Sequence, residues 1–279
     1  MSLFASLQKV VPQHGISRAA GRLAQSTTPW IKDSFINLFM RAYEVNLAEA
    51  EISDPGQFES FNAFFTRALK PGVRSVTSDP LALACPADGA ISQIGNIEDD
   101  TLLQAKGNRY SIDSLGQNLS QGFDGGSFFT VYLAPHNYHR LHIPFAGSLE
   151  ATLAVPGELF SVNATTEQAI DGLFCRNERL VCRFNTPFGP MLVVFVGAMI
   201  VGSIAAVWDQ KPTPYSQPEL KQFSDVNFDK GDEIGRFLLG STVICCFPKG
   251  AVALDETLVP GTPVEMGQSI GQSMGLTTS

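Results

Sequence analysis

The dipeptide Gly240–Ser241 is the place in this chain where a side chain could act on its own backbone. A free serine hydroxyl is a poor nucleophile at neutral pH, but a neighbouring base can activate it. The activated Ser241 oxygen could attack the carbonyl carbon of Gly240 and turn the peptide bond into an ester. β-Elimination would then cut the chain, and hydrolytic loss of ammonia would leave a pyruvoyl group. Glycine permits the tight backbone that this attack needs, because it has no Cβ.

A base for this reaction has to come from elsewhere in the chain, and the histidines are the first candidates. Three of the four histidines lie in residues 132–144, and His142 is one of them. A carboxylate improves such a base by fixing its tautomer. The candidate is Asp88, in the segment Pro-Ala-Asp-Gly that follows an apolar run. Asp88, His142 and Ser241 could form a triad, since triads are recognised by geometry and not by spacing. The alternative is structural, because Asp-Gly and Gly-Ser are also common in turns.

The other chemistry-bearing side chains give weaker signals. His139 and His142 would face opposite sides of a strand, but Pro135 and Pro144 bracket them and favour a loop, where they could converge. No third ligand is obvious, so no metal site is predicted. The five cysteines show no C-x-x-C spacing, which argues against zinc and against a disulfide framework. Arg67 and Arg140 could hold a phosphate or carboxylate, although an ion pair is the commoner use of arginine.

Composition indicates a globular protein with an uneven charge distribution. Apolar residues make up 44% and charged residues 16%, and the net charge is −8. Residues 1–32 nevertheless contain four basic side chains and no acid: Lys9, Arg18, Arg22 and Lys32. A basic arm on an acidic body favours an anionic lipid surface, and the alternative is a solvated helix face. No nucleic-acid partner is predicted.

Residues 191–208 are apolar over their whole length and just reach the length of a membrane-spanning helix. They are rich in valine and isoleucine, and Gly197 and Gly202 divide them into strand-sized pieces. Basic flanking residues are missing, since Asp209 follows directly. We therefore expect two buried strands with a bend at one of the glycines.

The patterning along the chain predicts an α+β fold. Helical spacing of apolar residues runs from Leu3 to Val10 and from Ile31 to Tyr43, with residues 12–15 between them. A third helix is expected to open at Ser53-Asp54-Pro55, with Phe58, Phe61 and Phe65 on one face. After residue 72, short strands alternate with turn residues, which is typical of a β-rich sandwich or barrel. The expected strands include residues 128–133, 148–155, 180–184 and 242–247. We expect a helical, membrane-facing region (1–72) followed by a β-rich catalytic domain (73–279).

Four motifs in order give the chain a family resemblance. They are Phe-Asn-Ala-Phe-Phe-Thr-Arg (61–67) with Leu-Lys-Pro-Gly (69–72), Pro-Ala-Asp-Gly (86–89), Tyr-His-Arg-Leu-His (138–142) and Leu-Gly-Ser-Thr (239–242). Together they resemble phosphatidylserine decarboxylase in its short bacterial form, over residues 58–272. The resemblance implies a proenzyme that cuts itself between Gly240 and Ser241 into a large chain (1–240) and a small chain (241–279). It assigns the self-cleavage to Asp88, His142 and Ser241.

The same resemblance implies the reaction and its setting. The pyruvoyl group made from Ser241 would form a Schiff base with phosphatidylserine, so that CO₂ leaves and phosphatidylethanolamine is released without pyridoxal phosphate or a metal. His139 lies next to the triad histidine and is our candidate for the proton donor to the α-carbon. The enzyme is expected to be a homodimer. It should be peripheral on the cytoplasmic side of the cell membrane and attached to its anionic surface through the N-terminal helices.

Three alternatives remain open at this point. The first is a pyruvoyl decarboxylase of a soluble amino acid, although the N-terminal arm favours a lipid substrate. The second is a non-catalytic phosphocarrier on a related β-sandwich, which would use His139 or His142 and leave the chain uncut. The third is a membrane-associated serine hydrolase, but Ser241 does not lie in a G-x-S-x-G elbow.

Overall fold

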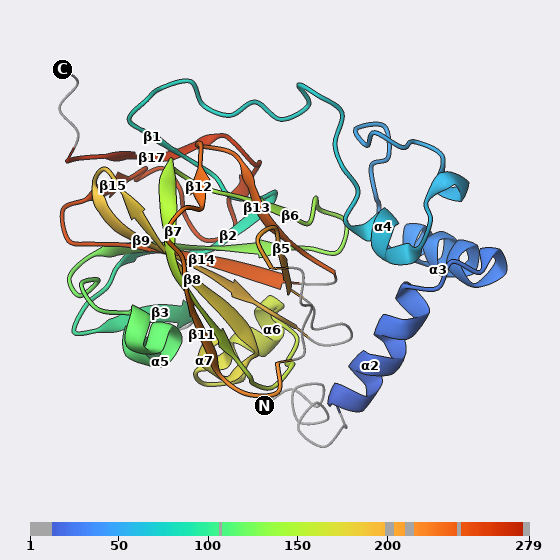
Figure 1. The fold of residues 1–279 in the computed structure, drawn as a ribbon, viewed down its shortest axis with the longest axis horizontal. Helices are drawn as coiled ribbons and strands as arrows, with labels where there is room; N and C mark the ends of the chain where they lie inside the picture. Colours follow the sequence, from blue (N-terminus) through green and yellow to red (C-terminus); the bar gives the residue numbers. More distant parts are fainter. Residues whose placement is uncertain (1–12, 106–107, 199–203, 210–214, 239–240, 276–279) are drawn as a thin grey trace.

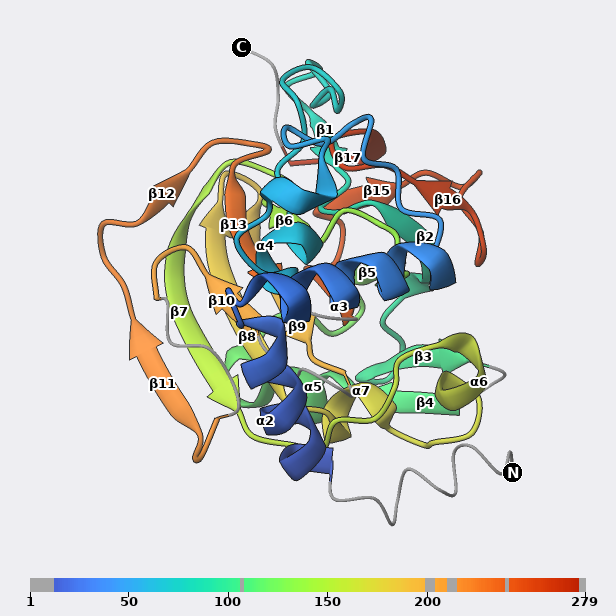
Figure 2. The same ribbon diagram turned by 90° about the vertical axis from the view of Figure 1, so that its right-hand side faces the viewer.

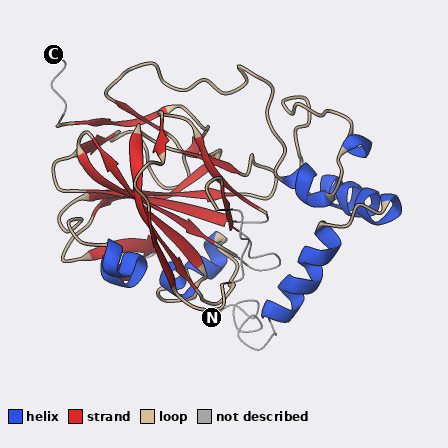
Figure 3. Ribbon diagram, in the orientation of Figure 1, coloured by secondary structure: helices blue, strands red, loops and turns tan. Residues whose placement is uncertain are grey.

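The computed structural model describes residues 13–105, 108–198, 204–209, 215–238 and 241–275 of the 279-residue chain. Helices gather at the N-terminal end, and strands make up most of the remaining structure (Figures 1 and 3). This arrangement confirms the predicted α+β class.

The N-terminal helices have an apolar core of their own. They are α2 (Gln13–Ala24), α3 (Pro29–Ala42), the 3-10 helix η1 (Pro55–Gln57) and α4 (Phe61–Phe65). One cluster of buried side chains joins α3, α4 and the segments around them: Ala24, Ile36, Leu47, Ala50, Phe58, Phe61, Phe64 and Phe65. The phenylalanines of the third predicted helix are therefore core residues.

Two helix predictions were wrong in detail. Residues 13–15, expected to separate two helices, belong to α2. The helix expected to open at Ser53 is two short ones, because Asp54 caps η1 through the N–H of Gly56 and Ser60 caps α4 through the N–H of Ala63. The helix expected from Leu3 to Val10 lies outside the described residues.

A nine-stranded antiparallel sheet forms the centre of the body. Its order is β11-β7-β8-β9-β14-β5-β2-β16, and β12 also pairs with β7. The strands are β2 (Gly89–Asn96), β5 (Ser127–Leu133), β7 (Gly147–Val155), β8 (Arg179–Thr186), β9 (Gly189–Val196), β11 (Glu219–Gln222), β12 (Asn227–Phe228), β14 (Ser241–Phe247) and β16 (Pro263–Val264). The four strands predicted over 128–133, 148–155, 180–184 and 242–247 all lie within it.

Both faces of this sheet are buried, and alternate residues of each strand point to opposite faces. Along β14, Val243 and Cys245 belong to one core cluster, and Ile244 and Cys246 to the other. This explains why the strand is apolar at successive positions rather than at every second one.

Small elements cover each face. The first face carries two three-stranded sheets, β10-β13-β6 and β1-β17-β15. These strands are β1 (Ala82–Ala84), β6 (Arg140–His142), β10 (Ile204–Ala206), β13 (Glu233–Phe237), β15 (Val252–Leu254) and β17 (Ser269–Ser273). The second face carries the hairpin of β3 (Thr101–Ala105) and β4 (Asn108–Ser111), with α5 (Ile112–Gly116), η2 (Gln117–Leu119), α6 (Ala164–Glu167) and α7 (Leu173–Arg176). Figure 1 shows these helices on the side of the sheet opposite β1 and β17.

The apolar stretch of residues 191–208 contains strands, as predicted. β9 runs through the middle of the central sheet to Val196, and β10 begins at Ile204 in a different sheet. The change of sheet follows Gly197, while Gly202 lies outside the described residues. Among the helices that the structure describes, none has the length and apolar character needed to span a bilayer.

Candidate active site

Two strand pairings hold the chain on either side of the Gly240–Ser241 bond. On the N-terminal side, β13 pairs with β6, and Glu233 lies opposite His142. The N–H of Phe237 donates to the carbonyl of His139, 2.9 Å away. On the C-terminal side, β14 begins at Ser241, opposite Leu133 of β5. Gly240 lies outside the described residues, and for Ser241 only the backbone is described.

Asp88 lies at the same end of the central sheet as Ser241. It immediately precedes β2, where Ala90 pairs with Tyr132, and Tyr132 pairs in turn with Thr242. β5 therefore separates β2 from β14, which places their backbones roughly 10 Å apart. The N–H of His142 donates to Pro86 (2.9 Å), so β6 lies beside the Pro-Ala-Asp-Gly segment. The fold thus brings the segments of all three expected triad residues to one region.

Asp88 is buried and held by an arginine that the sequence reasoning missed. Arg74 Nη2 lies 2.6 Å from Asp88 Oδ2, and its Nε lies 3.0 Å from Oδ1. The N–H of Met266 donates to Oδ1 at 2.8 Å. Arg74 also pairs with Glu49 at 3.0 Å, and these carboxylates raise its pKa above the usual range. Such a partner offsets the cost of burying a carboxyl group, and no local pattern in the sequence marks Arg74 for this role.

His142 has both ring nitrogens occupied. Nδ1 lies 2.8 Å from the carbonyl oxygen of Gly231, and Nε2 lies 3.0 Å from the hydroxyl of Tyr138. A carbonyl only accepts, so Nδ1 carries the proton and Nε2 accepts from Tyr138. Burial lowers the pKa of His142 and keeps the ring neutral, which suits a general base.

No hydrogen bond joins Asp88 to His142 within the described part of the chain. A small cavity of about 140 Å³ lies beside Asp88; it is lined by Arg74, Arg67 and the 136–138 segment, which includes Tyr138. Sequence reasoning also missed Tyr138, which hydrogen-bonds His142 and lines this cavity together with Asp88. Its place inside the Tyr-His-Arg-Leu-His motif is the one signal that pointed to it.

His139 lies in a different environment from His142. It is fully buried, its ring centroid is 4.0 Å from that of Phe65, and Nδ1 lies 2.8 Å from the carbonyl of Asn137. Nε2 is buried and has no hydrogen-bond partner among the described residues. Burial lowers the pKa of His139 to about 3, and the positive charge of Arg67 contributes. The loop expected around the two histidines is only partly correct, because His142 belongs to β6 while His139 precedes it.

Arg140 and Arg67, both candidates for anion binding, have different partners. Arg140 forms an ion pair with Glu233 at 2.9 Å and donates to the carbonyl of Thr66. Arg67 Nη2 donates to the carbonyls of His136 and Asn137, at 2.8 and 3.2 Å. Both arginines therefore tie the end of α4 to the segment that carries the histidines.

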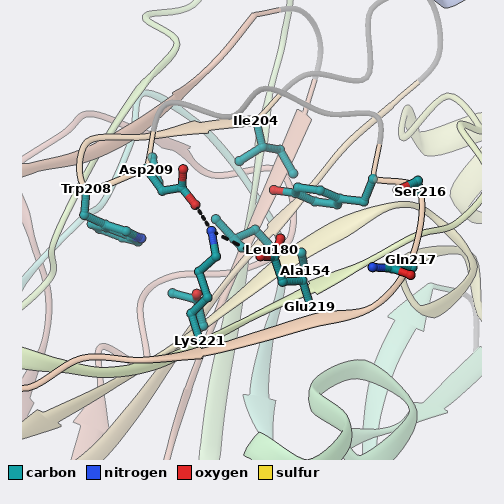
Figure 4. Close-up of a pocket in the computed structure, with 12 residues that line it drawn as sticks. Ala154, Leu180, Ile204, Trp208, Asp209, Ser216, Gln217, Glu219 and Lys221 are labelled. Atoms are coloured by element: carbon teal, nitrogen blue, oxygen red, sulfur yellow. Dashed lines mark hydrogen bonds and ion pairs between the residues drawn. The ribbon is translucent and has the colours of Figure 1, made fainter.

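A larger cavity of about 340 Å³ lies beside β10 (Figure 4). Its apolar lining includes Ala154, Leu180 and Ile204, whereas Lys221, paired with Asp209 and Glu219, gives it a polar side. Ile204 pairs with Phe237, the residue bonded to the backbone of His139. The cavity therefore lies close to the strand that leads to the Gly240–Ser241 bond.

Comparison with known proteins gives consistent matches over almost the whole chain. The family model described as phosphatidylserine decarboxylase matches residues 61–272, and a second model, described as PSD, matches residues 3–44. A phosphatidylserine decarboxylase proenzyme of Methylococcus capsulatus is 48% identical over 276 residues, covering 96% of both chains. Proteins of the same description from Alcanivorax borkumensis and Pseudomonas aeruginosa are also 48% identical, over 277 and 278 residues, and cover 96% of this chain and 95% and 96% of their own.

Proposed function

We infer that this chain, which belongs to the phosphatidylserine decarboxylase family, is the proenzyme of an enzyme that converts phosphatidylserine to phosphatidylethanolamine and CO₂. Membership over nearly the full length favours this function over the soluble amino-acid decarboxylase, the phosphocarrier and the serine hydrolase considered above. The substrate is a phospholipid, and the enzyme acts at a membrane.

The proenzyme cuts itself between Gly240 and Ser241. The observation that carries this proposal is the pair of strand contacts around the bond, with β13 against the histidine strand β6 and β14 against β5. His142 is the base that takes the Ser241 proton at Nε2, and Tyr138 must first release its hydrogen bond to that atom. Asp88, paired with Arg74 at 2.6 Å, supplies the carboxylate that stabilises the imidazolium.

A pyruvoyl group made from Ser241 fits the residues around it. After the cut, the pairing of β14 with β5 and β9 would keep the new end of the small chain in the sheet. The pyruvoyl carbonyl supplies an electrophile for the substrate amine and an electron sink for the loss of CO₂. His139, whose buried Nε2 has no partner in the described structure, then moves the proton. Because it is neutral here, it must gain a proton at Nε2 before it can donate one to the α-carbon.

We assign the larger cavity to the part of the phospholipid that adjoins its serine head group. Its mixed apolar and polar lining suits a molecule with both characters, and it lies beside the strand that carries the cleavage segment. Ala154→Trp should fill it, raising KM several-fold and leaving self-cleavage unchanged.

The N-terminal helices form the membrane-facing surface in this proposal. Trp30 and Leu38 on α3 are 74% and 69% exposed, although both are large and apolar, and Figure 2 shows α2 and α3 in front of the sheets. Arg22 and Arg41 are exposed on the same helices and suit an anionic surface. Lys32, counted in the basic arm, is instead buried and paired with Asp33. Flotation of Leu38→Glu with phosphatidylglycerol vesicles tests this surface, and sedimentation velocity tests the predicted homodimer.

Intact mass and turnover, measured on the same variants, test the central proposal. The unmodified protein should separate into chains 1–240 and 241–279, with the small chain resistant to Edman degradation, and Ser241→Ala should stay whole and inactive. His142→Ala should block the cut, whereas His139→Ala should permit it and abolish turnover. An active, uncut polypeptide would refute self-cleavage, and the reverse result for the histidines would exchange their roles.

A further inference from the structure

The short helix α4 contacts His139 by two routes. Phe65, its last residue, packs against the imidazole with ring centroids 4.0 Å apart. Arg67, two residues further on, donates through Nη2 to the carbonyl of Asn137. The same carbonyl accepts the hydrogen bond from His139 Nδ1, at 2.8 Å. One backbone oxygen thus joins the guanidinium of Arg67 to the ring of His139.

This shared carbonyl fixes the state of the ring. It can only accept, so it selects the tautomer with the proton on Nδ1 and leaves Nε2 as the basic atom. Arg67 holds the carbonyl in place from the other side and also anchors the preceding carbonyl, that of His136. The loop has its own brace, because the side chain of Asn137 accepts from the N–H of Ala134 at 2.7 Å. Arg67 adds the connection from this loop to the helical region.

The burial of Arg67 costs free energy that a purely structural role would not explain. It is only 4% exposed, and its Nε and Nη1 find no hydrogen-bond partner among the described residues. Burial lowers the pKa of Arg67, although nearby Asp88 and Glu49 oppose that shift. Unpaired buried donors are rare, and their persistence calls for a reason other than stability.

We propose that Arg67 is a positioning residue for decarboxylation, which holds the Asn137 carbonyl so that His139 keeps its proton on Nδ1 and its lone pair on Nε2. The proposal rests on the role given to His139 above. It also makes α4 the physical link between the helical region and that histidine, since Phe65 and Arg67 are both at its end. Self-cleavage, which uses His142, should not depend on Arg67.

Nitrogen-15 NMR of the imidazole rings tests this directly, because the chain has four histidines and a simple spectrum. The measurement uses the uncut Ser241→Ala protein, so it needs neither the pyruvoyl group nor activity. Combining Ser241→Ala with Arg67→Met should give a mixture of His139 tautomers and an upward shift of its titration midpoint. Arg67→Lys keeps the charge and should restore the original signals in part. Arg140→Gln is the matched control, because it loses a contact with α4 but none with the Asn137 carbonyl.

Kinetics separate this role from a general loss of structure. In the otherwise unmodified protein, Arg67→Met should cut itself to the same extent, with kcat lower by roughly tenfold or more and KM within about twofold. Unchanged His139 signals, or a folded Arg67→Met protein that no longer cuts itself, would overturn the proposal. If Arg67→Met does not fold, the test uses Arg67→Lys instead. His139 signals in Arg67→Lys that are identical to those of the parent protein would refute the positioning role of Arg67. An uncut but active parent enzyme would refute the proposed function and leave the NMR result standing.

Discussion

Two buried arginines of this protein show how differently the same side chain can be accommodated. Arg179, 2% exposed, lies on the second face of the sheet and donates to four backbone carbonyls: Ser114, Leu115, Cys175 and Asn177. Arg67, 4% exposed, lies between α4 and the histidine segment, and in the part of the chain that the structure describes only its Nη2 has partners. All three guanidinium nitrogens of Arg179 have partners, whereas Nε and Nη1 of Arg67 have none among the described residues.

The difference follows from what each arginine connects. Arg179 ties α5 and the end of α7 to β8, and helix carbonyls near a C-terminus attract a positive charge. Its hydrogen bonds offset the cost of burying the guanidinium. Within the described ranges of the chain, Nε and Nη1 of Arg67 find no partner, and neither does Nε2 of the neighbouring His139. We interpret Arg179 as a residue that stabilises the fold. Arg67 is instead a residue whose burial lowers stability and serves function.

Replacing Arg179 by methionine should have the largest effect on stability. Arg179→Met removes four hydrogen bonds and deprives the buried carbonyls of Leu115 and Asn177 of this donor, so the free energy of unfolding should fall by about 3 kcal/mol or more. Urea denaturation of the uncut Ser241→Ala protein measures this change. The control is Arg176→Met, since Arg176 is an exposed partner of Glu158 and its loss should cost less than about 1 kcal/mol. Equal losses in the two variants would contradict the structural role of Arg179.

The buried His139, next to Arg67, should make the free energy of unfolding fall at acid pH. His139 has a pKa of about 3 in the folded protein, whereas an unfolded histidine titrates near 6.5. The unfolded state therefore takes up the proton first, and stability is lost as the pH falls from about 6.5 toward 3. His139→Asn should remove about 2 kcal/mol of the loss in unfolding free energy between pH 8 and pH 5. His136→Asn, at an exposed position in the same segment, is the control, and an equal pH dependence in both would argue against the buried neutral ring.

Glu167, on the second face of the central sheet, should make the free energy of unfolding depend on pH in the opposite direction. Glu167 is buried there, and Ser92 Oγ donates to its carboxyl group at 2.8 Å. Burial raises its pKa to about 7, above the value near 4.3 of an unfolded glutamate. The unfolded state therefore releases the proton first, and stability is lost as the pH rises from about 4.3 toward 7. Glu167→Gln should remove about 2 kcal/mol of that loss between pH 5 and pH 8, measured by urea denaturation. The exposed Glu150→Gln is the control, and a similar gain in both variants would contradict the burial effect.

The sequence predicts the framework of this molecule better than the connections within it. The strands over residues 128–133 and 242–247 were recognisable because β-branched and aromatic residues fill them between turn residues. Helix boundaries failed near Ser53 and Gln13, where capping side chains and tertiary packing decide where a helix starts.

The candidate site shows the same division. Asp88, His142 and Ser241 could be named from their motifs, and the fold brings their segments to one end of the sheet. Arg74 and Tyr138, which bind two of them, could not be identified as partners. Arg74 is 14 residues from Asp88, and Tyr138 meets His142 only because β6 is buried against the body. Such contacts depend on tertiary packing, and periodicity carries no information about them.

Replacing Arg67 by methionine should have the smallest effect on stability, and this sharpens the contrast between the two arginines. The change removes two hydrogen bonds to carbonyls, but it also removes a buried charge and two donors that have no partner in the described structure. Apolar replacements of poorly paired buried charges are often close to neutral, so the free energy of unfolding should change by less than about 1 kcal/mol. Urea denaturation beside Arg179→Met measures both values under the same conditions. A loss as large as that of Arg179→Met would show that Arg67 also stabilises the fold, and the distinction drawn from their hydrogen bonds would then be wrong.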